Sequence, residues 1–533
     1  MTIFTHACLF NPVDCSWNLQ SFAVENGRVT ALDPVAVPSG ETVVDLQGKR
    51  VIPGLIDAHV HIESSLLIPR EFGRLVLSHG VTTAICDPHE IANVAGVAGI
   101  DFMLADAKYS PADLFFMVPS CVPATPLEVG GAVVTAKDLE KYVGNPAVLG
   151  LGEMMNVPGV LADDPEVCAK LALFSHVDGH APGLSGHDLK RYADHGISTD
   201  HECSTPEEVE ERLGLGMYVF LREGDAAKNV ASLVSAVTPE NAGKCAFCTD
   251  DRHADSIARE GTIDNCIRIA LGSGLPLELA LRMATLSAAE AVGLSDRGCI
   301  APGKIADFCV LDDRAPFKIT AVYKNGRKAE DTPVDAPVVS AGFAPVVTPD
   351  LSAVNLTYPA GAMKCIAVTD GSLLTDAVRV SSTDPGLNKL LCIDRYRGDK
   401  VGFCPVKGLC IRKGAIAESI MHDAHHIMAA GTQDADILQA VSAVVKAGGG
   451  MAVAVDGSVT LLPLPVGGLM TTERYESVCV QLAGQGAALQ KTGANPHAFM
   501  SLAFLGLTVI PHLKLTPRGL FDGDRFTDVP LEW

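Results

Sequence analysis

Two histidines separated by one residue, His59 and His61, end an apolar run in the segment LIDAHVHIESS. The run has the composition of a β-strand, and alternate side chains of a strand point the same way. Both histidines therefore share a direction with the flanking acids Asp57 and Glu63. Imidazole and carboxylate groups on one face can bind one metal ion. The spacing predicts a metal site at the end of this strand.

More apolar runs end in residues that can bind a metal ion. They end at Glu153 in GLGEMMN, His180 in VDGHAPG, His201 in STDHE and Asp250 in FCTDD. A single histidine at a strand end is more often structural, but repetition on successive strands favours a metal centre. The carboxyl ends of parallel strands share one face of a barrel, so these side chains would meet there. Imidazole and carboxylate ligands suit Zn²⁺, Mn²⁺ or Fe²⁺.

The elements that would position these residues lie in the central stretch, residues 54–295. Short buried runs alternate there with helix-like segments, such as TPEEVEERLGLG with Thr205 as its N-cap. Alternating strands and helices favour a parallel sheet, and about eight such units match the usual size of a (β/α)8 TIM-like barrel. A doubly wound α/β sheet is the alternative.

Both flanks of this stretch have strand patterns, as in FAVENGRVTALDP and GCIAPGKIADFCVLDD. We therefore expect residues 1–53 and 296–345 to build one small composite β-sandwich domain. Residues 330–365 are rich in Pro, Val and Ala and are expected to form a linker or a segment that wraps over the surface. A C-terminal α+β domain is predicted for residues 366–533, with strands in GGGMAVAVDGSVTLLPLP and a helix in TQDADILQAVSAVVKAGGG.

The composition excludes several classes of function. A net charge of −22 argues against nucleic-acid or polyphosphate binding, which draws on clustered Lys and Arg. The start MTIFTHACLFNP does not resemble a signal peptide, and no apolar run approaches the ~20 residues of a membrane helix. The 16 cysteines fit reduced thiols in a cytoplasmic protein. A small, weakly charged substrate fits best.

Longer motifs resemble a known family. VIPGLIDAHVHIESS resembles the opening of the amidohydrolase superfamily, and GCIAPGKIADFCVLDD resembles the returning segment of its urease-like β-sandwich. Within that superfamily, similarity to the adenine deaminase family extends over nearly the whole chain. It is carried by CDPHEIANVAGVAGI, GLGEMMNVPGV, DGHAPGLSG, LREGDAAKN, FCTDDRH and LPLPVGGLM.

The resemblance implies a binuclear metal centre, with manganese favoured and iron or zinc as alternatives. Its ligands would be His59, His61, Glu153, His180, His201 and Asp250. The first two histidines and the aspartate would hold one ion, and the other two histidines would hold the second. The glutamate would bridge them, where many superfamily members use a carboxylated lysine.

The implied reaction is hydrolytic deamination of adenine to hypoxanthine and ammonia, a step of purine salvage. Two ions that share a hydroxide lower the pKa of that water and hold it against C6 of the purine. Asp250 would take the hydroxide proton and deliver it to the departing amine, with Glu153 as the second catalytic carboxylate. Asp251 is the adjacent alternative, but Asp250 directly follows the apolar strand.

The substrate must also be held by groups that read its ring nitrogens. Asp87, His89, Glu90 and Glu223 are the candidate substrate-binding residues, since each lies in a predicted barrel-face loop. A sister activity on a modified adenine such as N6-methyladenine, or on another cyclic amidine or amide, remains the alternative. A non-catalytic scaffold is disfavoured because no ligand is missing. The expected partners are adenine and water, in a homodimer or higher oligomer.

Two further clusters receive weaker predictions. Cys245 and Cys248 form a C-x-x-C in a strand-like run, where we expect two strand cysteines rather than a redox motif. His422, His425 and His426 lie in HDAHH, where the family more often has HDSHN. A structural or pocket-lining role is favoured over a metal site. The H-x-E…P-C-x-x-C signature of nucleic-acid-type zinc deaminases is absent.

Overall fold

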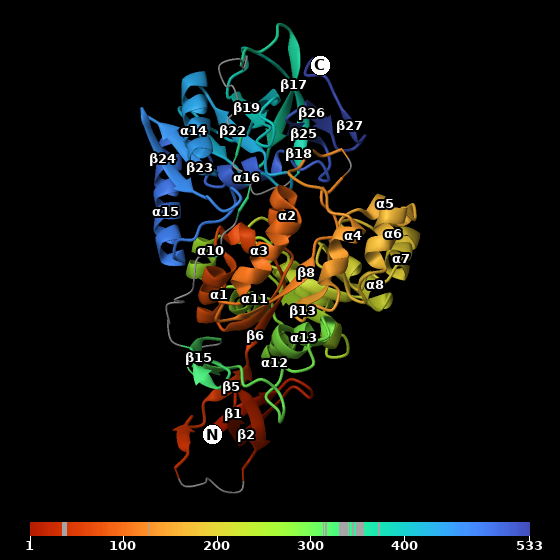
Figure 1. Ribbon diagram of the computed structural model, residues 1–533, viewed down its shortest axis with the longest axis vertical. Coiled ribbons are helices and arrows are strands. Elements are labelled where there is room, and N and C mark those ends of the chain that lie inside the picture. Colours follow the sequence, from red (N-terminus) through yellow and green to blue (C-terminus); the bar gives the residue numbers. More distant parts are fainter. Residues whose placement is uncertain are drawn as a thin grey trace.

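The computed structural model describes the chain except for residues 35–39, 126, 313, 315–316, 330–338, 340–341, 344–345, 348–355 and 371–373. Most of the predicted linker, residues 330–365, lies outside the described residues. Three bodies follow one another along the long axis: a sheet near the N-terminus, a central barrel and a C-terminal domain (Figure 1). The site described below lies where the barrel meets the C-terminal domain.

The central body is a barrel of eight strands, which confirms the predicted fold class. They are β6 (Leu55–Val60), β7 (Val81–Cys86), β8 (Asp113–Val118), β9 (Val148–Met154), β10 (Val177–Gly179), β11 (Thr199–Asp200), β12 (Tyr218–Arg222) and β13 (Cys245–Cys248). Strands β6 to β10 and β11 to β13 form two parallel ladders. Ser198 N donates to Val177 O at 3.1 Å beside the gap between β10 and β11, and a parallel bridge between Val60 and Asp250 joins β13 to β6. The strands therefore close into a ring in chain order.

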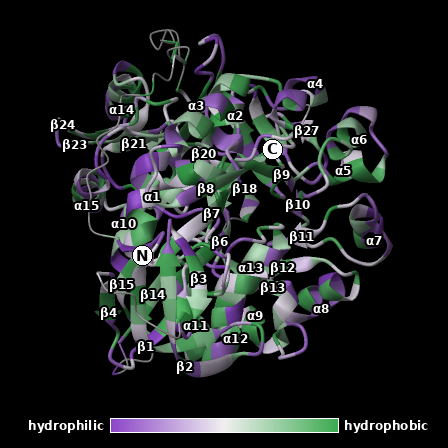
Figure 2. Cartoon of the chain, turned by 60° about the horizontal axis from the view of Figure 1, so that its bottom comes forward, coloured by the Kyte–Doolittle hydropathy of each residue, from purple (hydrophilic) through white to green (hydrophobic). Residues whose placement is uncertain are grey.

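Helices follow the barrel strands and cover them. They are α1 (Pro69–Ser78), α2 (His89–Ala95), α3 (Val97–Ala107), α4 (Ala136–Leu139), α5 (Val157–Leu161), α6 (Pro165–Leu171), α7 (Gly186–Asp194), α8 (Pro206–Gly214), α9 (Val230–Leu233), α10 (Ala254–Glu260), α11 (Ile263–Gly272), α12 (Leu277–Arg282) and α13 (Ala288–Ala291). Outer helices such as α8 carry both hydrophilic and hydrophobic residues (Figure 2). The predicted cap of α8 is confirmed, because Thr205 and Glu208 form a capping box.

Strands from both flanks join in one sheet. They are β1 (Thr2–Asn11), β2 (Ser16–Glu25), β3 (Arg28–Leu32), β4 (Thr42–Asp45), β5 (Arg50–Pro53), β14 (Phe308–Leu311), β15 (Ile319–Lys324) and β16 (Arg327–Lys328). Strand β14 pairs antiparallel with β5, with Phe308 opposite Pro53. Aromatic packing of Phe4 against Phe22 and Phe308 fills its core. The domain boundaries given above stay predictions.

The C-terminal domain is built on a second eight-stranded sheet. Its strands are β17 (Ala362–Val368), β18 (Thr375–Ser381), β19 (Asn388–Ile393), β20 (Val401–Lys407), β21 (Ala415–Glu418), β22 (Ile427–Gly431), β23 (Gly450–Val455) and β24 (Ser458–Pro463). The remaining elements are α14 (Asp434–Lys446), α15 (Tyr475–Thr492), α16 (Ala498–Phe504), β25 (Leu513–Thr516), β26 (Gly519–Asp522) and β27 (Thr527–Asp528). The predicted helix and strands thus correspond to α14, β23 and β24.

Two other expectations concern thiols and membranes. Cys245 and Cys248 are buried in β13, as predicted for strand cysteines, and all 16 cysteines are free. None of the described helices combines the length and apolarity that crossing a membrane requires.

Candidate metal centre and substrate cavity

Strand β6 and the residue after it place His59 and His61 side by side, and each ring is held through its Nδ1 atom. His59 Nδ1 bonds to Asp178 Oδ2 at 2.7 Å, and His61 Nδ1 bonds to the backbone oxygen of Asp87 at 2.9 Å. Acceptors at Nδ1 fix the tautomer that has its lone pair on Nε2. The two Nε2 atoms lie 3.2 Å apart and face the same point.

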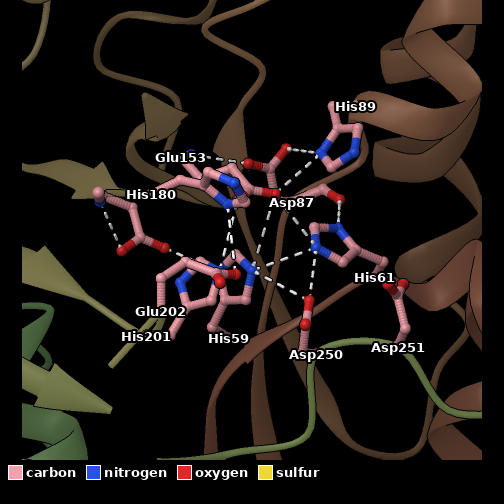
Figure 3. Close-up of polar contacts among 12 residues, drawn as sticks. His59, His61, Asp87, His89, Glu153, His180, His201, Glu202, Asp250 and Asp251 are labelled. Atoms are coloured by element: carbon pink, nitrogen blue, oxygen red, sulfur yellow. Dashed lines mark hydrogen bonds and ion pairs between the residues drawn. The ribbon is translucent and has the colours of Figure 1, made fainter. Parts of the chain in front are cut away.

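Carboxylate oxygens face this point from other strands. Asp250 Oδ1 lies 3.1 Å from His61 Nε2 and 3.8 Å from His59 Nε2, and Glu153 Oε1 lies 3.3 Å from His61 Nε2 (Figure 3). Nitrogen lone pairs that face buried carboxylate oxygens repel one another unless a cation lies between them. The donor set therefore fits a divalent cation, as Zn²⁺, Mn²⁺ or Fe²⁺ would require.

A second group of ligands shares the carboxylate of Glu153. Its Oε2 lies 2.6 Å from His180 Nδ1 and 3.4 Å from His201 Nε2, while its Oε1 faces the first group. The ligand atoms of each group lie within 4.8 Å of one another. One carboxylate between two sets of imidazoles has the arrangement of a bridging ligand. The structure thus brings together all six residues that the sequence nominates as ligands.

Both central carboxylates are held in the anionic form. Burial alone would raise the pKa of Glu153, but the imidazoles around it, His180 foremost, hold that pKa well below its usual range. Burial acts in the same direction on Asp250, and there the cation of Arg222, followed by His61, holds the pKa well below the usual range. Both carboxylates are therefore available as anionic ligands for a cation.

Three residues that the sequence analysis did not nominate complete the centre. Arg222 Nη1 donates to Asp250 Oδ2 at 2.8 Å and also pairs with Glu202. Glu202 Oε1 lies 3.5 Å from both His180 Nδ1 and His201 Nε2, and Asp178 holds His59 as described. A signal existed for two of them, since Glu202 directly follows His201, and Asp178 lies in β10 two residues before His180.

The predicted substrate-binding residues fall into different places. His89 and Glu90, at the start of α2, line the cavity above the metal-binding residues, and His89 Nδ1 lies 3.3 Å from Glu153 Oε1. Asp87 does not line it, because its Oδ2 accepts the backbone N–H of Glu153 at 2.8 Å and braces β9. Glu223 does not line it either, and its carboxylate accepts a hydrogen bond from the backbone of Val230, the first residue of α9.

The opposite wall of the cavity belongs to the C-terminal domain. We call it the C-terminal wall, and it consists of Phe504, Leu507, Val509, Ile510 and Pro511. His422 and Asp423, from the HDAHH segment, line the cavity beside it. A cavity with an apolar wall and a few converging polar groups is typical of a small-molecule site. The predicted pocket-lining role therefore agrees with the position of His422.

Comparisons with known proteins agree with this geometry. The model of the amidohydrolase family matches residues 50–329, and that of the adenine deaminase C-terminal domain matches residues 367–527. An adenine deaminase of Methanoregula boonei is 48% identical over 99% of this chain and 96% of its own length. Adenine deaminases of Methanoculleus marisnigri and Geobacillus kaustophilus are 47% and 42% identical, over 96% and 92% of this chain and 99% and 90% of their own lengths. A solved atrazine chlorohydrolase from Arthrobacter aurescens has 17% identity and a TM-score of 0.48 over 63% of this chain and 97% of its own.

A parallel barrel with histidines and carboxylates at its strand ends defines a metal-dependent hydrolase of the amidohydrolase class, and that family implies a metal centre. The match extends through the C-terminal domain at high identity. The chain belongs to the adenine deaminase family.

Proposed function

We propose that this protein hydrolyses adenine to hypoxanthine and ammonia. The observation that carries the proposal is the cavity itself, in which the Glu153 carboxylate, shared by two ligand groups, faces an apolar wall across a space lined by His89 and Glu90. A flat heterocycle can pack against that wall while its reacting carbon faces the ligands. The family to which the chain belongs supports the same substrate.

The centre is proposed to hold two ions, with Mn²⁺ favoured and Fe²⁺ or Zn²⁺ as alternatives. The ligands are proposed to be His59, His61, Glu153, His180, His201 and Asp250. Bound there, the ions would lower the pKa of a water molecule and supply a nucleophile at neutral pH.

The proton path is proposed to run through Asp250. The oxygen of the water bonds to C6 of adenine, and the bond from C6 to the exocyclic amine breaks. One water proton passes to the Asp250 carboxylate, which delivers it to the departing amine, and the amine leaves as ammonia. The other proton ends on ring N1 of hypoxanthine. Arg222 binds Asp250 Oδ2 at 2.8 Å, which leaves Oδ1 facing the centre to exchange this proton. Asp251 is bound by the Ser64 hydroxyl instead, and we assign the path to Asp250.

Recognition of the ring is proposed to involve His89 and Glu90 directly. Asp87 would act by bracing the strand that carries Glu153, since it binds that residue's N–H at 2.8 Å. The role of Glu223 in substrate binding stays a prediction. Any influence of Glu223 on the substrate would be indirect, through the backbone at Val230 that it binds.

A panel of purines tests the proposal. Protein reconstituted with Mn²⁺ is expected to release one ammonia for each adenine consumed, with hypoxanthine as the other product. Release of methylamine from N6-methyladenine with adenine inert would contradict the proposal and favour the sister activity. Size-exclusion chromatography with light scattering tests the proposed homodimer or higher oligomer, and fractionation of cells tests the proposed cytoplasmic location.

A further inference from the structure

One side chain of the C-terminal domain projects between the barrel and the C-terminal wall. His422 follows β21 and lines the same cavity as His61, Glu153 and Asp250. It also lines a small adjoining recess, where Glu90 and Asp251 of the barrel face Ile420 and Met500 of the C-terminal domain. His422 thus stands at the junction of two cavities and of two domains.

Two contacts fix the His422 ring in this position. Its Nδ1 bonds to Glu90 Oε1 at 2.5 Å, across the domain boundary. The ring stacks on Phe504, with centroids 4.5 Å apart and planes inclined by 18°. The other oxygen of Glu90 contacts His425. With Nδ1 and one ring face occupied, Nε2 is the polar atom of the ring left for a ligand in the cavity.

Carboxylates surround the His422 ring: Glu90 Oε1 lies 2.5 Å from its Nδ1, and Asp251 and Asp423 line the same cavity. Such negative surroundings favour the protonated ring, in which both nitrogens donate. Burial lowers its pKa, but Glu90, and after it Asp251 and Asp423, raise the pKa to about 10. Glu90 is 2% exposed, so its charge acts on the ring with little screening by water. A protonated imidazole carries a hydrogen on each nitrogen, and Nε2 can then only donate.

The chemistry of the ligand requires such a donor. Adenine has three ring nitrogens that accept hydrogen bonds and two N–H groups that donate them. Glu90, Asp251 and Asp423 in the cavity lining can accept the latter when ionised. Arg222 is occupied by Glu202 and Asp250, so His89 and His422 are the side chains best placed to donate to a ring nitrogen. A donor in the cavity that is left without its acceptor weakens binding, which penalises a ring that lacks the nitrogen.

We propose that His422 Nε2–H donates a hydrogen bond to one ring nitrogen of the purine, so that the C-terminal domain supplies a specificity-determining residue. The inference rests on the proposed function and names part of its recognition. Glu90 is in this account a positioning residue, because it orients the ring through Nδ1.

The test pairs one side-chain change with single-atom changes in the ligand. Inhibition constants of 1-deaza-, 3-deaza- and 7-deazaadenine are measured with the wild-type protein and with His422→Phe, which keeps a ring to stack on Phe504. In the wild type, the analogue that lacks the contacted nitrogen is expected to bind about 10- to 100-fold more weakly than the others. In His422→Phe that difference is expected to vanish, while the ratios among the other analogues stay unchanged. His422→Gln, which retains an N–H, is expected to restore part of the difference.

Several outcomes would overturn the proposal. One is a His422→Phe protein that weakens all three analogues by the same factor, because that is the result of a purely structural role. Another is loss of one metal equivalent per chain in elemental analysis of the variant, because His422 would then be a metal ligand. His187→Phe, at an exposed histidine, is the matched control and is expected to change no constant. The readout is binding, so failure of the wild-type protein to deaminate adenine would defeat the proposed function separately.

Discussion

The two sides of the active-site cavity are built in different ways. On the barrel side, the metal-binding residues stand at or just beyond the ends of strands, and carboxylate or backbone oxygens hold the outer nitrogens of His59 and His61. On the other side, the C-terminal wall occupies the end of the short helix α16 and the loop before β25. Side chains on strands are positioned more precisely than side chains on loops, and loops tolerate more substitution. Under the two proposals above, the barrel supplies the reaction and the C-terminal domain supplies part of the selectivity.

The two sides meet at Glu90. Its carboxylate binds His422 of the C-terminal domain and lies 3.6 Å from His89 Nε2. The other ring nitrogen of His89, Nδ1, lies 3.3 Å from Glu153 Oε1. A change on one side can therefore reach the other through a short path. The predictions below separate the two sides, from the largest expected effect to the smallest.

Removing the metal ions is expected to abolish turnover, because the barrel side then lacks its nucleophile. Dialysis against a strong chelator followed by addition of Mn²⁺ should remove and restore ammonia release from adenine. The C-terminal wall contains none of the proposed ligands, so a metal-free protein is expected to keep its thermal transition in that domain. Full activity in protein shown by elemental analysis to be metal-free would contradict the assignment.

Asp250→Asn is expected to lower kcat by about 10²- to 10⁴-fold, since the amide cannot accept the proton and is a weaker ligand. The expected loss is in kcat, measured by ammonia release at saturating adenine and Mn²⁺. Asp251→Asn is the matched control, because Asp251 is adjacent and lines the same cavity. A larger loss in the control than in Asp250→Asn would assign the proton path to Asp251.

Asp178→Ala is expected to weaken metal binding by about 10- to 100-fold, because His59 loses the carboxylate that orients it at 2.7 Å. The measurement is metal content after dialysis against limiting Mn²⁺, and excess Mn²⁺ should recover most of kcat. Asp188→Ala, at an exposed position on α7, serves as the control. Equal metal content in both variants would show that the Asp178 contact does not support the ligand.

Phe504→Leu probes the C-terminal wall. The substitution keeps an apolar side chain but removes the aromatic face that stacks on His422. Loss of about 1 kcal/mol of aromatic packing predicts a several-fold rise in KM for adenine, with kcat changed little. Steady-state kinetics separate the two constants. A fall in kcat at unchanged KM would link the wall to the reaction itself rather than to binding.

Glu128→Gln is expected to change how stability depends on pH. Burial, and after it the nearby charge of Asp423, raise the pKa of Glu128 to about 8. The carboxyl group of Glu128 accepts a hydrogen bond from the Thr508 hydroxyl, beside the C-terminal wall. An acid whose pKa is higher in the folded state stabilises the protein at low pH, and this contribution is lost as the pH rises toward 8. The wild-type Tm should therefore fall between pH 5 and 8 relative to the variant, by at least about 2–4 °C. Parallel Tm curves would show that Glu128 is not protonated in the folded state.

The sequence predicts the barrel side well because strand alternation and strand ends are local properties. It therefore locates His59, His61 and Asp250 without knowledge of the fold. Adjacent residues are harder to separate, since neighbours on a strand point opposite ways. Glu223 is the residue nominated from the sequence, but its neighbour Arg222 is the one that lines the cavity.

The C-terminal contribution could not be derived from local patterns. His422, which stacks on Phe504, meets Glu90 only because the C-terminal domain lies on one face of the barrel (Figure 1). No periodicity or spacing encodes that contact, which joins helix α2 to a loop 332 residues further along the chain. Only the pocket-lining expectation for the HDAHH segment indicated it.

The sheet that joins both flanks of the barrel has a consequence for the order of folding. Strand β5 precedes the barrel in the chain, but its partner β14 follows the whole barrel. During synthesis, the edge of β5 that pairs with β14 stays open until the barrel has emerged from the ribosome. Contacts between residues so distant in sequence form slowly, and an open strand edge can pair with another chain. The N-terminal strands are thus the first part of the protein to be made, but their sheet waits for the whole barrel, and until then its open edge can aggregate with other newly made chains.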